Sequence, residues 1–220
     1  MTKDSLIDYY SRRAAAYERI YRKPERQTDL VRLRERLRSL LTGRRVLELA
    51  CGTGYWTAAI ADLAVSVLAT DASDAVLEIA RSRTLDADRV NFARADAWRA
   101  NEIRGDFDAG FAAFWWSHVP KQQLSSFLSA FHVALRPAAR LVFVDNRFVE
   151  GSSTAISRSD DANNTYQVRQ LEDGTTHEVL KNFPSRAELL ALIEPNAREV
   201  ELHEFDYFWC LSYKLNVADP

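Results

Sequence analysis

The chain has 220 residues, 47% hydrophobic and 27% charged, and these values exclude a mainly disordered, collagen-like or coiled-coil protein. Its formal net charge is -2, so no overall field attracts nucleic acid or an anionic membrane. We therefore expect one soluble domain, and we look first at Gly52 and Gly54, two of only seven glycines, which share one turn.

Helical and strand patterns alternate along the chain, which is typical of a parallel sheet covered by helices on both faces. Residues 6–22 and 27–41 are predicted to be helical, with Gly43 as a left-handed stop. Ser73 or Asp74 is expected to cap a later helix. Strands are predicted at 45–50, 65–70, 90–94, 107–115 and 140–145, and helices between them at 55–63, 73–83 and 122–135.

The pattern changes after the fifth strand. Residues 146–183 are polar and rich in Ser, Asp and Asn, which is long for a plain loop and predicts a functional insert beside the active site. Ser185 is expected to cap a helix that ends at Ile193. Residues 198–205 and 207–215 are predicted to close the fold as two strands around a tight turn at Asp206.

The first strand leads directly into ELACGTGYWT, residues 48–57, and such a strand-to-helix turn is where open α/β sheets bind ligands. A dinucleotide fingerprint needs a third glycine, but Thr57 occupies that position. Glu48 is expected to repel phosphate and to favour a cation such as an α-amino group or a sulfonium. The turn therefore predicts a zwitterionic ligand without phosphate.

Two further carboxylates follow strands at the same edge. Asp71 ends the second strand, where it can accept hydrogen bonds from ribose hydroxyls; the alternative is a helix N-cap. Asp96, Ala97 and Trp98 follow the third strand, where a carboxylate and backbone amides can bind the edge of an adenine ring. Asp after a strand is also ordinary turn chemistry.

Together these segments resemble the class I S-adenosylmethionine-dependent methyltransferases, over about residues 45–146. The motifs that carry the resemblance are VLELACGTG, LATDAS, ARADAW, FDAGFAAFWWSHVP and LRPAARLVFVDN. The resemblance implies a Rossmann-like α/β fold: a doubly wound seven-stranded sheet in the order 3-2-1-4-5-7-6, the last strand antiparallel, with helices on both faces. It divides one methyltransferase domain into an N-terminal helical lid (1–42), a cofactor-binding core (43–146), an insert bordering the acceptor pocket (147–184) and a closing helix and strand pair (185–220).

The resemblance also implies the cofactor S-adenosylmethionine, with S-adenosylhomocysteine as product. It places the methionine part near the glycine turn, the ribose at Asp71 and the adenine beside Asp96. It also implies that tyrosines of the N-terminal segment YYSRRAAAYERIY close over the bound cofactor. The residues implied to contact the cofactor are Tyr9, Tyr17, Glu48, Ala50, Cys51, Gly52, Gly54, Asp71, Ala72, Asp96, Ala97 and Phe114. Ala50 and Pro137-Ala138-Ala139 stand where the family commonly has Gly and Pro-Gly-Gly, which leaves the local backbone geometry open.

The acceptor is expected to be a small molecule with an O, N or C nucleophile. His118, after the fourth strand, is the candidate general base, with an orienting role as the alternative. Trp115 and Trp116 are neighbours on that strand and face opposite ways, so one is expected in the core and the other in the acceptor pocket. Asn146 and Arg147 leave the fifth strand at the same edge and are further acceptor candidates.

The remaining features concern location. Cys51 and Cys210 form no Cys-x-x-Cys motif or Cys/His cluster, which predicts neither a disulfide framework nor a metal site. The N-terminus has no apolar signal segment, and no apolar run approaches the ~18 residues that span a bilayer. We expect a cytoplasmic protein with no metal, no membrane partner and no nucleic-acid partner.

Three alternative functions stay open. The first is an RNA or protein methyltransferase, although the Asn-Pro-Pro-Tyr type motif of many nucleic-acid methyltransferases is absent after the fourth strand. The second is an NAD-binding Rossmann oxidoreductase, against which Glu48 and the missing third glycine argue. The third is a protein that binds the cofactor without turnover, because a fold and a cofactor site do not establish catalysis.

Overall fold

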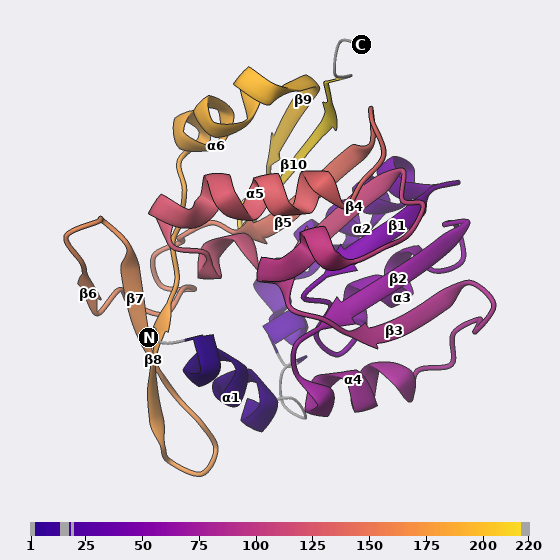
Figure 1. Cartoon of the computed structure of the whole chain (residues 1–220). Helices are drawn as coiled ribbons and strands as arrows, with labels where there is room; N and C mark the ends of the chain where they lie inside the picture. The colour runs from indigo at the N-terminus through magenta and orange to yellow at the C-terminus, as the bar shows by residue number, and fades with distance from the viewer. Residues whose placement is uncertain (1–2, 14–17, 19, 217–220) are drawn as a thin grey trace.

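The computed structural model describes residues 3–13, 18 and 20–216. A seven-stranded sheet in the order β3-β2-β1-β4-β5-β10-β9 runs through the middle of the molecule (Figure 1). The strands are β1 (Arg45–Leu49), β2 (Ser66–Asp71), β3 (Val90–Arg94), β4 (Ala109–Ala113), β5 (Arg140–Asn146), β9 (Ala197–Glu204) and β10 (Phe208–Leu215). β1 to β5 pair in parallel, and β10 is antiparallel to both β5 and β9. The predicted order, with its antiparallel strand, is confirmed.

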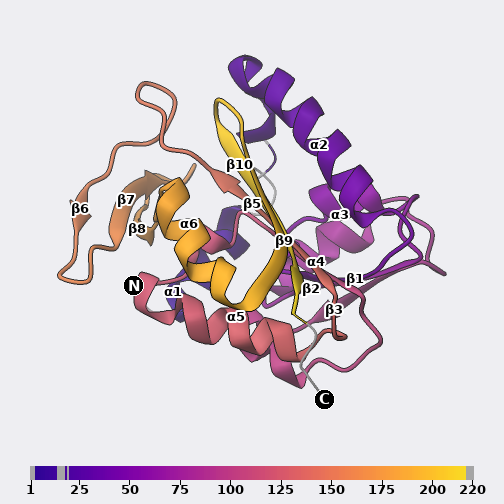
Figure 2. The same cartoon turned by 90° about the horizontal axis from the view of Figure 1, so that it is seen from above.

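Helices cover both faces of this sheet, because consecutive residues of the central strand point to opposite sides. In β1, Val46 belongs to one buried cluster and Leu47 to the other, and both side chains are fully buried. Figure 2 shows the two layers, with α2 and α3 on one side of the sheet and α5 and α6 on the other. The covering helices are α2 (Gln27–Leu41), α3 (Tyr55–Ile60), α4 (Asp74–Arg81), α5 (Leu124–Val133), α6 (Arg186–Ile193) and the 3-10 helix η3 (Ala97–Glu102).

The insert after β5 forms a small antiparallel sheet of its own, in the order β6-β7-β8. Its strands are β6 (Arg158–Ser159), β7 (Thr165–Gln170) and β8 (Thr176–Leu180). This sheet stands beside the N-terminal helix α1 (Lys3–Arg13), away from the large sheet (Figure 1). The ring of Tyr9 in α1 packs on His177 of β8, with centroids 5.5 Å apart, and the Ser11 and Ser73 hydroxyls are 2.7 Å apart. α1 therefore bridges the insert and the loop after β2.

Several predicted boundaries hold. The helix at 27–41 and the strand at 90–94 match, and Gly43 has a left-handed φ of 71°. Ser185 caps α6 in a full capping box with Glu188, and the closing hairpin turns between Phe205 and Phe208.

Other boundaries were wrong. Residues 20–22 form a 3-10 turn rather than the end of a long α-helix, because Pro24 follows closely and disfavours helix before it. β4 ends at Ala113, two residues early, since Phe114 takes a left-handed φ of 59°. Ser73 occupies the N-cap of α4 as predicted, but it makes no side-chain capping bond, and its hydroxyl contacts Ser11 instead. No helix in the described part of the chain is both long and apolar enough to cross a membrane.

Candidate active site

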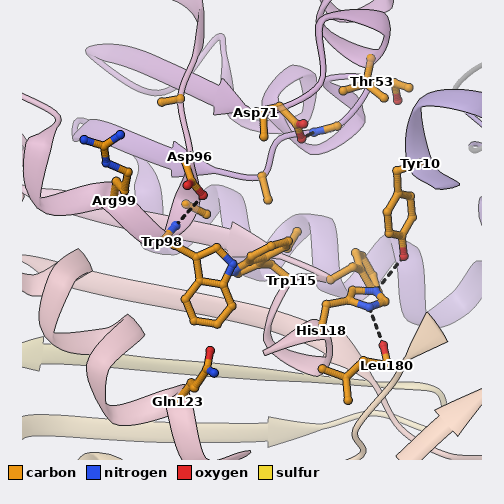
Figure 3. Close-up of a pocket in the computed structure, with 18 of the residues that line it drawn as sticks. Tyr10, Thr53, Asp71, Asp96, Trp98, Arg99, Trp115, His118, Gln123 and Leu180 are labelled. Carbon is orange, nitrogen blue, oxygen red and sulfur yellow. Dashed lines mark hydrogen bonds between the residues drawn. The ribbon is translucent and has the colours of Figure 1, made fainter. Parts of the chain in front are cut away.

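A cavity of about 520 Å³ opens at the carboxyl ends of β1, β2, β3 and β4, where open α/β sheets bind ligands (Figure 3). In this view Asp71 and Asp96 lie above the cavity, and His118 lies below them. Seven of the twelve residues implied to contact the cofactor line the cavity: Ala50, Gly52, Asp71, Ala72, Asp96, Ala97 and Phe114.

The turn after β1 contains two glycines, and each is required for a different structural reason. Gly52 lines the cavity with φ 55°, and a Cβ there would meet no protein atom within 4 Å, so the missing side chain opens space for a ligand. Gly54 has φ 73° but does not line the cavity. A Cβ on Gly54 would lie 3.2 Å from Ala80 and Phe92, so this glycine allows α3 to pack against α4 and β3.

Asp71 is held at the cavity wall by backbone amides. Its Oδ2 accepts a hydrogen bond from the Gly52 amide and its Oδ1 accepts one from the Ser73 amide, each at 2.9 Å. Burial raises the pKa of Asp71, and the two amides partly oppose that shift. Asp71 thus ties the glycine turn to the loop after β2 and presents its carboxyl to the cavity.

Glu48 lies beneath the turn and does not line the cavity. It is 1% exposed, and its Oε2 accepts a hydrogen bond from the Thr57 hydroxyl at 2.7 Å. Burial raises the pKa of Glu48 to about 8, so the carboxyl is largely uncharged at neutral pH. A carboxyl with a raised pKa repels phosphate less than expected, and Glu48 supports the turn from below through its bond with Thr57. Cys51 is also buried, outside the cavity lining, and burial raises the pKa of its thiol.

Asp96 lines the cavity just after the end of β3. Its Oδ1 accepts a hydrogen bond from the Trp98 amide at 3.0 Å, which caps η3. The Trp98 ring packs edge-on against Trp115, with centroids 6.2 Å apart, and both rings line the cavity. Asp96 therefore makes the ordinary turn bond that was the alternative to ligand binding, and it also lines the cavity.

At the opposite end, His118 connects three distant segments. Its Nδ1 lies 2.7 Å from the Leu180 carbonyl oxygen, and its Nε2 lies 2.7 Å from the Tyr10 hydroxyl (Figure 3). A carbonyl only accepts, so Nδ1 carries the proton and Nε2 of the neutral ring accepts from Tyr10. Burial, and then the positive charges of Lys181 and Arg169, lower the pKa of His118 well below its usual value. The imidazole is therefore neutral, with its basic nitrogen toward the cavity.

The four residues proposed for the acceptor do not gather in one place. Trp115 lines the cavity, whereas Trp116 packs in the core against Phe143 and Trp209. Asn146 hydrogen-bonds Asp145, and Arg147 donates to the Phe205 carbonyl at 2.5 Å; neither lines the cavity.

The tyrosines of the N-terminal segment are placed differently from the expectation. Tyr9 is 1% exposed, and its hydroxyl accepts from Arg13 at 3.1 Å; it does not line the cavity. Tyr17 lies outside the described residues. Tyr10 reaches the cavity instead, and sequence reasoning missed it. The adjacent pair Tyr9-Tyr10 was a signal, but which neighbour faces the cavity depends on how α1 packs.

No three His, Cys, Asp or Glu side chains in the described ranges are grouped so that they could hold a metal ion.

Known sequences resemble the part of the chain that contains β1 to β4 and the cavity residues on them. The model of a methyltransferase domain family matches residues 46–138. A demethylmenaquinone methyltransferase from Clavibacter sepedonicus is 36% identical over 107 residues, 48% of this chain. The match covers 42% of that relative, so the chain aligns with less than half of its length.

Solved structures extend the similarity to nearly the whole chain. The DhpI–SAH complex is 30% identical with a TM-score of 0.78, over 97% of this chain and 96% of DhpI. The DhpI–SAM–HEP complex is 29% identical with a TM-score of 0.79, over 97% and 99% of the two chains. The PH0226 protein from Pyrococcus horikoshii OT3, 15% identical with a TM-score of 0.70 over 88% and 92%, shares the fold. The chain therefore belongs to the class I S-adenosylmethionine-dependent methyltransferases, as an enzyme whose cofactor is S-adenosylmethionine.

Proposed function

We propose that this methyltransferase transfers the methyl group to an O, N or C nucleophile of a small molecule by in-line displacement. The observation that carries the proposal is one cavity lined at one end by Gly52, Asp71 and Asp96 and at the other by Tyr10 and His118. A ligand that fills the first end leaves its remaining contacts to the second. The pocket size, about 520 Å³, is within the range typical of small-molecule sites.

The residues at the first end fit the cofactor. Asp71 offers a carboxyl suited to ribose hydroxyls, Gly52 removes the side chain that would block close approach, and Asp96 with Ala97 offers a carboxylate and an amide for the adenine edge. When bound, S-adenosylmethionine supplies an electrophilic methyl group on a positively charged sulfur. The protein then has to orient the acceptor and exclude water, which accounts for much of such a reaction's acceleration.

At the second end, we propose that His118 accepts the proton that the acceptor releases, directly or through the Tyr10 hydroxyl. Nε2 is the basic nitrogen, and it already accepts a hydrogen bond from Tyr10 at 2.7 Å. For a relayed transfer, the acceptor proton moves to the Tyr10 oxygen while the Tyr10 proton moves to Nε2. The lowered pKa of His118 keeps Nε2 unprotonated at neutral pH, and it also makes the ring a weaker base than a free histidine.

We further propose that α1 is the lid over this cavity. Tyr10 reaches His118 from α1, Ser11 contacts Ser73, and Glu18 accepts from the Thr53 hydroxyl at 2.8 Å beside the glycine turn. These contacts attach the N-terminal segment to both ends of the cavity. A lid that encloses the acceptor favours a small molecule over a nucleic acid or a protein surface.

The names of two relatives agree with a small acceptor. One relative is a demethylmenaquinone methyltransferase, and DhpI is known in a complex with SAM and HEP. The near-neutral net charge also provides no overall field that would attract RNA. For this chain we propose only the class, a small-molecule acceptor, and neither of the two compounds.

Two experiments test the proposal. Calorimetry with S-adenosylhomocysteine should show binding, whereas NADH should give neither heat nor a thermal shift; the reverse result would favour the oxidoreductase. Methyl-labelled S-adenosylmethionine is then incubated with the enzyme and three fractions of cell extract: small molecules, protein and RNA. Label should enter the small-molecule fraction, and label confined to RNA or protein would contradict the proposal.

A further inference from the structure

A buried ion pair lies next to His118. Lys181 directly follows β8 and Asp145 lies in β5; they are 4% and 0% exposed, with Nζ and Oδ1 2.9 Å apart. Burial opposes the charged form of Asp145, but the Lys181 ammonium and the hydrogen bonds from Ser117 and Lys181 outweigh it and hold the pKa of Asp145 below its usual value. Removing two charges from water costs about as much as their attraction returns, so stability alone does not account for such a pair.

The ion pair fixes the residue that precedes His118. The Ser117 hydroxyl accepts from Lys181 Nζ at 2.5 Å, and the Ser117 amide donates to Asp145 Oδ2 at 2.9 Å. The Ser117 carbonyl accepts from the Asn182 amide at 2.8 Å. All three polar groups of Ser117 are therefore bonded to Asp145 or to the strand end at Lys181 and Asn182.

The same strand end also holds the ring of His118. Leu180 directly precedes Lys181, and its carbonyl oxygen is the acceptor for His118 Nδ1. A shift of Lys181 would move this carbonyl, because adjacent residues share a rigid peptide plane. The position of the Leu180 carbonyl decides which ring nitrogen carries the proton.

We propose that Lys181 and Asp145 are positioning residues for His118: their ion pair clamps the end of β8 against Ser117, so that the Leu180 carbonyl keeps the proton on Nδ1 and leaves Nε2 facing Tyr10 and the cavity. The orientation is a property of the ring itself. Its use in methyl transfer rests on the function proposed above.

The test uses a variant without either charge, Lys181→Met with Asp145→Asn. The asparagine oxygen can still accept from the Ser117 amide, and removing both charges together avoids leaving one buried and unpaired. The groups that face His118 in this variant are Arg169 from β7 and Tyr10 from α1, both unchanged. Long-range ¹⁵N NMR of histidine-labelled protein saturated with S-adenosylhomocysteine reports the tautomer, and loss of one of the four histidine signals in His118→Gln identifies the ring.

We expect the wild type to show the Nδ1–H tautomer of His118. In the double variant we expect the tautomer ratio to shift toward Nε2–H by about tenfold, the factor that one lost hydrogen bond typically produces. The matched control is Lys121→Met with Glu188→Gln, which removes another lysine–carboxylate pair of 2.9 Å, exposed and without contact to His118; it should leave the tautomer unchanged. Ser117→Ala, which keeps both charges and removes one clamp contact, should shift the ratio in the same direction but less.

An unchanged His118 tautomer in the folded double variant overturns the positioning role. If the double variant does not fold by circular dichroism, an unchanged tautomer in Ser117→Ala overturns it instead. Failure of the proposed function is a separate result, seen as the absence of calorimetric binding of S-adenosylhomocysteine by the wild type.

Discussion

The two ends of the cavity are built differently. We call the end lined by Gly52, Asp71 and Asp96 the cofactor end and the end lined by Tyr10 and His118 the acceptor end, after the ligands proposed for them. At the cofactor end, Gly52, Asp71 and Asp96 each lie within three positions of the end of a parallel strand, and the sheet aligns those ends along one edge. At the acceptor end, Tyr10 and Leu180 meet His118 across 108 and 62 residues of chain. The cofactor end follows from the sheet alone, whereas the acceptor end exists only after α1 and the insert have packed against it.

The difference extends to charge. The cofactor end rests on a carboxyl, Glu48, that burial keeps largely uncharged. The acceptor end rests on an ionised pair, Lys181 and Asp145, whose partners come from the insert and the sheet. Each end therefore has its own buried polar support.

The largest expected effect is on the pH dependence of stability, in Glu48→Gln. The folded pKa of Glu48 is about 8 against an ordinary value of 4.5, so its stabilising contribution is complete below pH 4.5 and is lost as the pH rises through 8. The difference of 3.5 pKa units corresponds to at most about 5 kcal/mol, at 1.36 kcal/mol per unit. Urea unfolding at pH 5 and pH 9 should show a loss of several kcal/mol in the wild type that Glu48→Gln lacks. The exposed Glu78→Gln is the control, and equal pH dependence in all three proteins would show that Glu48 is charged in the folded state.

The next effect is on turnover, at the acceptor end. With the acceptor identified from the labelled fraction, His118→Gln should lower kcat by about 10²-fold to 10⁴-fold, the usual contribution of a positioned base. Tyr10→Phe should lower it less, and Tyr9→Phe is the matched control because its hydroxyl pairs with Arg13 and not with His118. The Kd of S-adenosylhomocysteine should stay within about threefold in all three variants. An unchanged kcat in His118→Gln would exclude His118 as the general base.

The pH profile tests the same residue in the wild type. Because the pKa of His118 lies well below 6.5, wild-type kcat should not fall until the pH drops well below that value.

This asymmetry also explains how far the sequence could predict the structure. Strand order and the placement of Asp71 follow from local apolar runs and from the rule that parallel strands end at one edge. The choice of Tyr10 over Tyr9 depends on the rotation of α1, and the role of Lys181 depends on where the insert lands; neither has a local signal. Gly54 shows the limit even inside a recognised motif, since its missing side chain serves helix packing and not the cavity.

A smaller effect is expected on cofactor affinity from Asp71→Asn. A hydrogen bond to a charged group contributes about 1.5–3 kcal/mol, so the Kd of S-adenosylhomocysteine should rise about tenfold to a hundredfold by calorimetry. Asp74→Asn is the matched control, because Asp74 is exposed three residues later and pairs with Arg94 at 2.9 Å. If both variants weaken binding equally, the effect comes from general charge and not from a contact at the cofactor end.

The smallest effects concern Ala50 and Ala138, two of the three alanines that stand where the family commonly has glycine. Ala50 and Ala138 keep left-handed backbones, with φ of 52° and 59°, so the glycine geometry is retained at a cost of about 1–2 kcal/mol for each residue. Replacing either by glycine removes this strain but adds about 0.4–1 kcal/mol of unfolded-state entropy, so each variant should gain about 1 kcal/mol or less in urea unfolding. Only Ala50 lines the cavity, and only Ala50→Gly should therefore also change the Kd of S-adenosylhomocysteine, by a few-fold, through a looser turn. An equal change of Kd in Ala138→Gly would mean that cofactor affinity responds to the stability of the whole sheet. The cofactor end would then depend on distant parts of the fold, as the acceptor end does.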